Sequence, residues 1–220
     1  MHNHSHNHLD HSHHHNDLHE AKTKWVVILS AITMLAEITY GYLSNSMALL
    51  ADGWHMSSHV LALGLTWVAY RVIKYWKKKP HAHGNENKVL SLSGYTSAVI
   101  LAVVGILILF ESAERLFHTE VIIYTEAMMV ACIGLLVNGI SALILKHDHG
   151  HSDHNIQAAY LHVLADTVTS LLAISALFFG QMFNLPWLDA AAGILGALVV
   201  LNWSVSLLKS SAKQLLEYKT

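Results

Sequence analysis

Long apolar runs separated by short polar stretches dominate the chain. Three runs of 19 residues, at 92–110, 127–145 and 190–208, contain no formally charged side chain. A helix of about 20 apolar residues is long enough to cross the hydrocarbon core of a bilayer. These three runs are therefore predicted to be transmembrane helices.

Three further segments, at 25–43, 47–70 and 156–180, are long enough to span but carry polar groups. Glu37 interrupts the first, and the other two contain histidines and aspartates that lower their hydropathy. With them, the pattern predicts an all-α membrane protein with six transmembrane helices over residues 25–208, in contact with membrane lipid. Only 13% of residues are charged, about half the share in soluble domains. The connections are too short for a soluble domain, and no nucleic-acid partner is expected.

The basic residues are distributed asymmetrically between the two ends of these helices. Of 13 Lys and Arg residues, all except Arg115 flank helix ends that face the same side in this topology. The positive-inside rule then places both termini in the cytoplasm, with 209–220 as a short tail. The first 20 residues have no apolar core, so we expect no signal peptide and insertion into the cell (inner) membrane by the first helix. The single cysteine, Cys132, is expected to be a small core residue.

Histidines cluster in three places on the predicted cytoplasmic side. Residues 1–24 form a His-rich tail with nine histidines, which we expect to be disordered without metal. A purification tag is the trivial alternative, but tags are uniform histidine runs and this tract alternates with Asn, Ser and Asp. Imidazole binds Zn, Co, Ni and Cu, so these clusters are predicted to collect metal. The collecting residues are His11, His13, His14, His15, His81, His83 and, in the loop at 147–154, His147, His149, His151 and His154.

Two pairs of metal-capable side chains lie inside the polar-interrupted segments. His55 and His59 are four residues apart, and so are His162 and Asp166. On a helix each pair projects from one face, and ionisable groups within a membrane usually mark a transport path. A lone intramembrane histidine is as readily explained by a hydrogen bond between helices, but two pairs at matched spacing favour a four-ligand metal site.

Three other polar residues belong near this predicted site. Asp52 lies one turn before His55 and is interpreted as an entrance or supporting carboxylate rather than a fifth ligand. Glu37 and Asn138 either line the cavity or form hydrogen bonds between helices, and the sequence does not favour one reading.

Three imidazoles and one carboxylate favour Co, Ni or Zn over Mn, Mg or Ca. Histidine titrates near neutral pH and must lose its proton to bind metal. The pattern therefore predicts exchange of a divalent metal for protons, and no prosthetic group is expected.

The sequence MALLADGWHMSSH at 47–59, taken with AYLHVLAD at 159–166, resembles the cation diffusion facilitator family. FESAERL at 110–116 and WLD at 187–189 extend the resemblance. It implies a six-helix, proton-coupled exporter of divalent transition metals with two ligands on the second helix and two on the fifth. His59, where zinc exporters of the family commonly have Asp, makes the chain most similar to the bacterial cobalt/nickel-exporting branch. The family's usual C-terminal cytoplasmic domain is expected to be lacking, and a homodimer is the expected assembly.

Two other functions compete with metal export. A membrane metalloenzyme would need a catalytic base beside its metal, as in His-Glu-x-x-His, and the sequence contains no such motif. A membrane protein that buffers or senses metal, with its histidine tracts active and its core inactive, is the second alternative.

Overall fold

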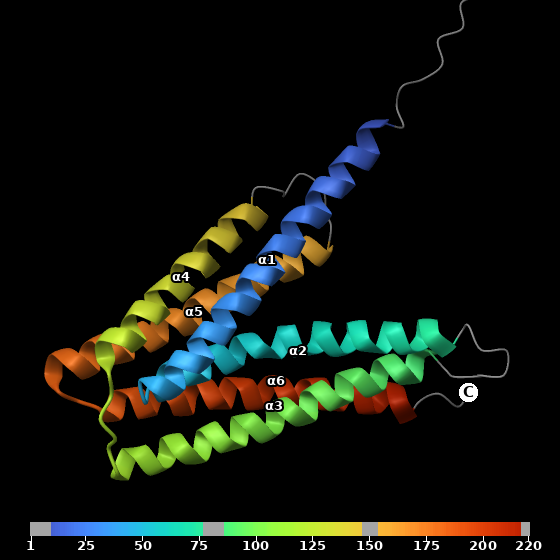
Figure 1. Cartoon of the computed structure of the whole chain (residues 1–220). Coiled ribbons are helices and arrows are strands. Elements are labelled where there is room, and N and C mark those ends of the chain that lie inside the picture. The colour runs from blue at the N-terminus through green and yellow to red at the C-terminus, as the bar shows by residue number, and fades with distance from the viewer. Residues whose placement is uncertain (1–9, 77–85, 147–153, 217–220) are drawn as a thin grey trace, which may run out of the picture.

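The computed structural model describes residues 10–76, 86–146 and 154–216, and within these ranges the secondary structure is helical, without strands. As predicted, there are six helices, shown in Figure 1: α1 (Asp10–Leu43), α2 (Met47–Trp76), α3 (Glu86–Phe117), α4 (Tyr124–Lys146), α5 (His154–Phe183) and α6 (Trp187–Leu216).

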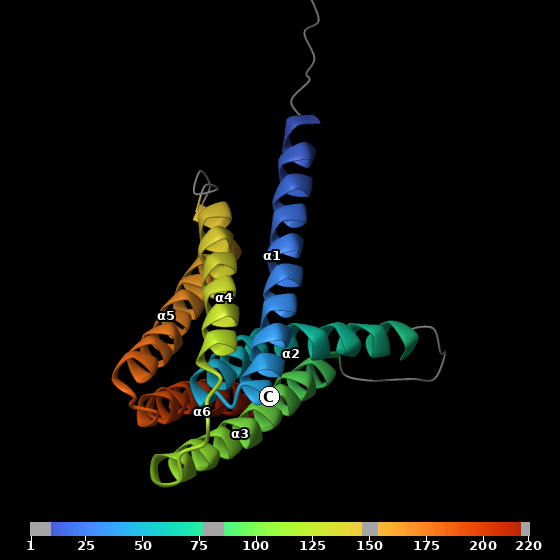
Figure 2. The same ribbon diagram turned by 60° about the vertical axis from the view of Figure 1, so that its left-hand side comes forward.

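The helices form two groups that meet at one end and diverge toward the other. Figures 1 and 2 show α1, α4 and α5 running in one direction, and α2, α3 and α6 running in another. The connections α1–α2, α3–α4 and α5–α6 lie at the end where the groups meet. Helix α2 is central because it packs against α1, α3, α5 and α6. Side chains on α2 can therefore contact helices of both groups.

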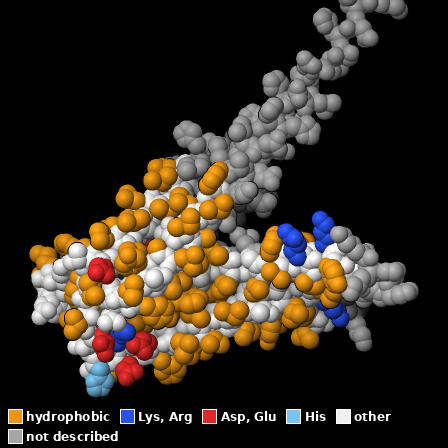
Figure 3. All heavy atoms as spheres, viewed as in Figure 1, with side chains coloured by type: hydrophobic (Ala, Val, Ile, Leu, Met, Phe, Trp, Pro, Cys, Tyr) orange, Lys and Arg blue, Asp and Glu red, His pale blue; other side chains and the backbone are white. Residues whose placement is uncertain are grey.

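Four described segments are long and apolar enough to cross a membrane: Lys88–Phe117, Tyr124–Ser141, Leu164–Phe183 and Trp187–Leu216. In α1 the apolar part is the shorter Ile28–Leu43, and no described part of α2 is as long and apolar as these four segments. Figure 3 shows hydrophobic side chains over most of the visible face, with Lys and Arg near the far end of α2. An apolar exterior of this kind suits lipid rather than water.

Two predictions about the ends and faces of helices are wrong. Helix α1 begins at Asp10, so residues 10–24 are helical rather than disordered, while 1–9 lie outside the described residues. Extending an existing helix adds one hydrogen bond per residue and avoids the nucleation step. Cys132 is exposed on α4 rather than packed in the core. In a membrane protein both the interior and the lipid face are apolar, so a small apolar residue does not indicate which way it points.

Asparagine residues close two of the helices at the end where the groups meet. Asn45 and Asn184 have φ values of 56° and 53°, the left-handed conformation that commonly ends helices. After α1, the N–H of Ser46 bonds to the carbonyl of Gly41 at 3.0 Å, and Leu185 bonds in the same way to Gly180 at 2.9 Å. These tight caps allow α2 and α6 to turn back directly along the bundle.

The start of α2 is anchored on α6 through one buried carboxylate. Asp189 accepts hydrogen bonds from Ser46 Oγ at 2.7 Å, the Met47 amide at 2.7 Å and the Ala48 amide at 3.2 Å. Ser46 also caps α2 directly, because its Oγ accepts from the Leu49 amide at 3.1 Å. The first amides of a helix lack partners within the helix, and Asp189 supplies them from 142 residues along the chain.

Small residues let α2 and α6 approach closely beyond this anchor. A Cβ placed on Gly196 would lie 2.8 Å from the Cβ of Ala51, and one on Gly193 would lie 2.7 Å from the Cβ of Met47. Helices in membranes associate through such close packing. The crossing fixes the inner face of α2 against α6, immediately before the segment that carries Asp52 and His55.

Candidate metal-transport site

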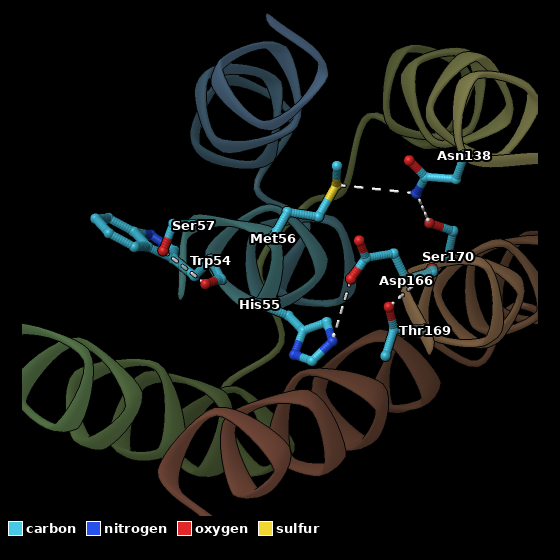
Figure 4. A network of polar contacts seen from close by, with 8 residues as sticks. All are labelled: Trp54, His55, Met56, Ser57, Asn138, Asp166, Thr169 and Ser170. Atoms are coloured by element: carbon cyan, nitrogen blue, oxygen red, sulfur yellow. Dashed lines mark hydrogen bonds and ion pairs between the residues drawn. The ribbon is translucent and has the colours of Figure 1, made fainter. Parts of the chain in front are cut away.

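His55 of α2 and Asp166 of α5 come together in the middle of the bundle. The distance from His55 Nε2 to Asp166 Oδ1 is 3.4 Å, and the two residues are 2% and 4% exposed. Figure 4 shows the two side chains pointing toward one another from their helices. A histidine–carboxylate pair this deeply buried offers one nitrogen and one oxygen ligand to a divalent cation.

The other two predicted ligands belong to the same two helices. His59 lies one turn after His55 on α2, and His162 one turn before Asp166 on α5. Their side chains lie outside the described part of the structure. Among the side chains that are described, no group of three or more His, Cys, Asp or Glu is close enough to hold a metal. The four-ligand site therefore stays a prediction, of which the structure brings His55 and Asp166 together.

A tilted aromatic ring on α6 packs beside the histidine. The ring centroids of His55 and Trp203 are 6.4 Å apart, with an interplanar angle of 80°. This edge-to-face contact restricts the orientation of the imidazole. Trp203 could not be predicted from the sequence, since a tryptophan within an apolar helix gives no signal of a neighbouring ligand.

A cavity of about 230 Å³ lies beside the pair, between α2, α5 and α6. Its polar lining comes from Asp52, His55 and Thr169, and the rest is apolar or small. Since a water molecule occupies about 30 Å³ in the liquid, the space admits a partly hydrated cation. The cavity extends along α2 from His55 to Ala48, close to the anchored end of the helix.

Asp52, the predicted entrance carboxylate, lines this cavity and is 3% exposed. Neither oxygen of its carboxylate has a hydrogen-bond partner among the described residues. Asp52 thus shares the cavity with His55, and its role as an entrance carboxylate stays a prediction.

Asn138 joins three helices around the pair. Its Nδ2 donates to Ser170 Oγ of α5 at 3.4 Å and lies 3.9 Å from Met56 Sδ of α2. Figure 4 shows the amide projecting from α4 between these helices, with its oxygen turned to the α1 side. That oxygen has no hydrogen-bond partner among the described residues. The amide nitrogen thus serves the interhelical role that the sequence allowed.

Glu37 is fully buried on α1, at 0% exposure, and the described residues supply no hydrogen bond to either carboxylate oxygen. It lies against the backbone of α4, because a Cβ added to Gly134 would overlap Glu37 Oε1. Glu37, Asp52 and Asp166 are thus three buried acids on three helices. The described Lys and Arg residues lie toward helix ends, so they do not neutralise this group. Buried charges without partners are costly, and acids clustered within a membrane domain usually mark an ion path or a proton relay.

The predicted collecting histidines lie away from this region or outside what is described. His11, His13, His14 and His15 are in the first turns of α1 and His154 begins α5, but their side chains are not described. The remaining members, His81, His83, His147, His149 and His151, lie outside the described ranges. Metal collection by these residues therefore stays a prediction.

Residues 24–216 match the cation efflux transmembrane domain, and the chain belongs to that family. It is 32% identical over 192 residues to a zinc transporter, ZitB, of Pectobacterium atrosepticum, covering 86% of this chain and 59% of the relative. It is also 30% identical over 209 residues to a cadmium, cobalt and zinc/H(+)-K(+) antiporter of Bacillus velezensis, covering 92% and 66%. With the metal cation efflux system protein CzcD of Cupriavidus metallidurans the identity is 31% over 207 residues, covering 94% and 65%.

The chain thus spans about three fifths to two thirds of the length of these relatives. The matched domain and the apolar helices identify a multi-pass protein of the bacterial inner membrane. Membership of this family also places the protein among transporters rather than enzymes.

Proposed function

We propose that this protein exports Zn²⁺, Co²⁺ or Ni²⁺ from the cytoplasm in exchange for protons. The observation that carries the proposal is the buried contact between His55 and Asp166, which joins α2 to α5 at 3.4 Å beside a cavity. Ionisable groups are expensive within a membrane and persist there when they bind a transported ion or relay protons.

The transport site is proposed to consist of His55, His59, His162 and Asp166. The contact between His55 and Asp166 brings the two helices together, and the second histidine of each helix is one turn from its partner. Four ligands of this kind suit a tetrahedral divalent cation. Loading requires unprotonated imidazoles, so an arriving metal displaces protons and a proton supply on the far side returns them.

Metal preference follows from the nitrogen-rich ligand set. Three neutral imidazoles and one carboxylate around a dication leave one formal positive charge, so selection relies on nitrogen affinity, which favours Co, Ni and Zn over Mn, Mg and Ca. Relatives are named for zinc, and for cadmium, cobalt and zinc. Because His59 stands where zinc exporters of the family commonly have Asp, we place this protein nearest the cobalt- and nickel-exporting members.

The proposed orientation has both termini and the histidine tracts in the cytoplasm, as the basic residues indicate. The tracts then raise the metal concentration near the cytoplasmic opening without belonging to the path. A homodimer is the proposed assembly.

Purified protein in proteoliposomes tests this function. Uptake of Zn, Co, Ni, Cd and Mn is followed in parallel with a metal-sensitive dye, under an imposed pH gradient and without one. We expect gradient-dependent flux of Zn, Co or Ni and little flux of Mn. A protein that only buffers or senses metal would bind the ions and move none across the membrane, which would refute the proposal.

A further inference from the structure

Glu37 is a buried acid that the four-ligand site does not use. Its side chain is 0% exposed, and the described residues supply no hydrogen bond to either oxygen. The absence of a side chain at Gly134 is what lets the carboxylate reach α4. The glycine leaves the space that this carboxyl group occupies against α4.

The groups around Glu37 give an ionised carboxylate nothing to pair with. From α2 it faces Asp52, and from α5 it feels the charge of Asp166. Helix α4 contributes Gly134 and, one turn along the same face, Asn138. Asn138 is 1% exposed, and its Oδ1 has no hydrogen-bond partner among the described residues. Both ionisable neighbours are therefore acidic. With acids on either side, Glu37 in the empty state is neutral and carries a proton.

A divalent cation at the neighbouring pair reverses this balance. Two positive charges arrive beside Asp166, and in a region of low dielectric they favour ionisation of every nearby carboxyl group. Asp52 lines the cavity beside His55, and Asp166 is itself a proposed ligand, so both can face the cation directly. Glu37 does not line that cavity, and it is therefore the buried acid whose response to the metal is the loss of a proton.

We propose that Glu37 carries a counter-transported proton, which is bound while the metal site is empty and released when a divalent cation is loaded. The inference rests on the proposed exchange function. On loading, the O–H bond of the Glu37 carboxyl breaks, its electron pair stays on the carboxylate, and the proton leaves to the cytoplasmic solution. When the metal departs to the other side, a proton from that side restores the O–H bond.

Counting charges shows what this proton accomplishes. Loading brings two positive charges into the buried region, and loss of the Glu37 proton offsets one of them. The proposed exchange at the ligand set, which must be unprotonated to bind the metal, supplies the second proton. Exchange of one divalent cation for two protons then keeps the buried charge constant, so no step carries an additional desolvation penalty.

A proton fits Glu37 better than an alkali or alkaline-earth cation does. Hard metal cations collect six or more oxygen ligands at well-defined distances. Glu37 does not line the cavity beside His55, and its Oε1 lies directly against α4. A single carboxylate packed against α4 and outside that cavity does not supply such a ligand set, whereas one carboxyl group is enough to hold a proton.

The test is the coupling ratio of Glu37→Gln in proteoliposomes, with Glu114→Gln as a matched control because Glu114 is exposed on α3. Protons moved per metal are measured with an internal pH dye, and the membrane potential is clamped with potassium and valinomycin. For the wild type and Glu114→Gln we expect about two protons per metal and flux insensitive to potential. Glu37→Gln should move about one proton per metal and respond to potential, because one net charge now crosses.

The inference would be overturned if Glu37→Gln kept the wild-type number of protons per metal and the wild-type response to potential. A wild-type ratio near one proton per metal would also overturn it. Neither result would count against metal export. Wild-type protein that moves no metal would overturn the proposed function as well. If Glu37→Gln inserts but does not transport, calorimetric titration of metal in two buffers of different ionisation enthalpy counts the protons released on binding. About one fewer proton than the wild type supports the assignment, and an equal number refutes it.

Discussion

Removing the carboxylate of Asp189 should loosen the start of α2 and weaken the whole bundle. In Asp189→Ala three donors lose their acceptor: Ser46 Oγ at 2.7 Å and the Met47 and Ala48 amides at 2.7 and 3.2 Å. Hydrogen bonds to charged groups contribute about 1.5–3 kcal/mol each, and loss of a helix cap costs about 0.5–2 kcal/mol. These terms overlap, and the Ser46 cap on Leu49 remains, so we expect a loss of about 3 kcal/mol in the free energy of unfolding.

Reversible unfolding in mixed detergent micelles, followed by helix content and by tryptophan fluorescence, measures this loss. Asp189→Asn keeps one acceptor oxygen and should lose about half as much as Asp189→Ala. Glu120→Ala removes an exposed acid at the same end and should stay within about 0.5 kcal/mol of the wild type. His55 lies about 12 Å along α2 from Met47, so transport by Asp189→Ala should fall as well. An Asp189→Ala protein as stable as the Glu120→Ala control would refute the anchoring role.

Three further predictions concern selectivity, metal supply and pH. His59→Asp adds an anionic oxygen ligand and should shift transport toward Zn or Cd at the expense of Co and Ni; an unchanged ranking in parallel uptake assays would remove the charge argument. Deletion of residues 2–20 should leave maximal flux near normal and weaken apparent metal affinity, whereas complete loss with normal membrane insertion would place the tail in the mechanism. Imidazole ligands must be neutral to bind metal, so cytoplasmic loading should weaken as pH falls from about 7.5 to 6, and affinity constant over that range would contradict histidine ligation.

The apolar runs were sufficient to predict six helices because each element that spans a membrane must satisfy its own backbone hydrogen bonds. The four-residue spacing puts His55 and His59 on one face of α2, and His162 and Asp166 on one face of α5, since the face of a helix follows from its period. These are local properties of the sequence. The 3.4 Å approach of His55 to Asp166 is seen only in the structure. The start of α1 at Asp10 was missed because helix propagation from an adjacent stable segment overrides a polar composition.

Contacts between distant segments could not be predicted in the same way. The bond from Met47 to Asp189 joins residues 142 positions apart, and nothing near either residue signals it. Gly134 becomes meaningful only when α1 and α4 are seen to touch at Glu37. The lipid-facing position of Cys132 was also out of reach, because apolar residues cover both sides of a membrane helix.

The central claim is that side chains of α2 and α5 together carry the metal. Its most direct test measures metal flux in proteoliposomes with a proton gradient whose acidic side is opposite the cytoplasmic face. Wild-type protein is compared with His55→Ala, His59→Ala, His162→Ala and Asp166→Ala. His118→Ala is the control, because His118 is exposed in the α3–α4 connection. The account predicts that each of the four variants inserts normally and loses metal flux, while the control transports at the wild-type rate. Near-normal flux in three of the four variants would contradict it.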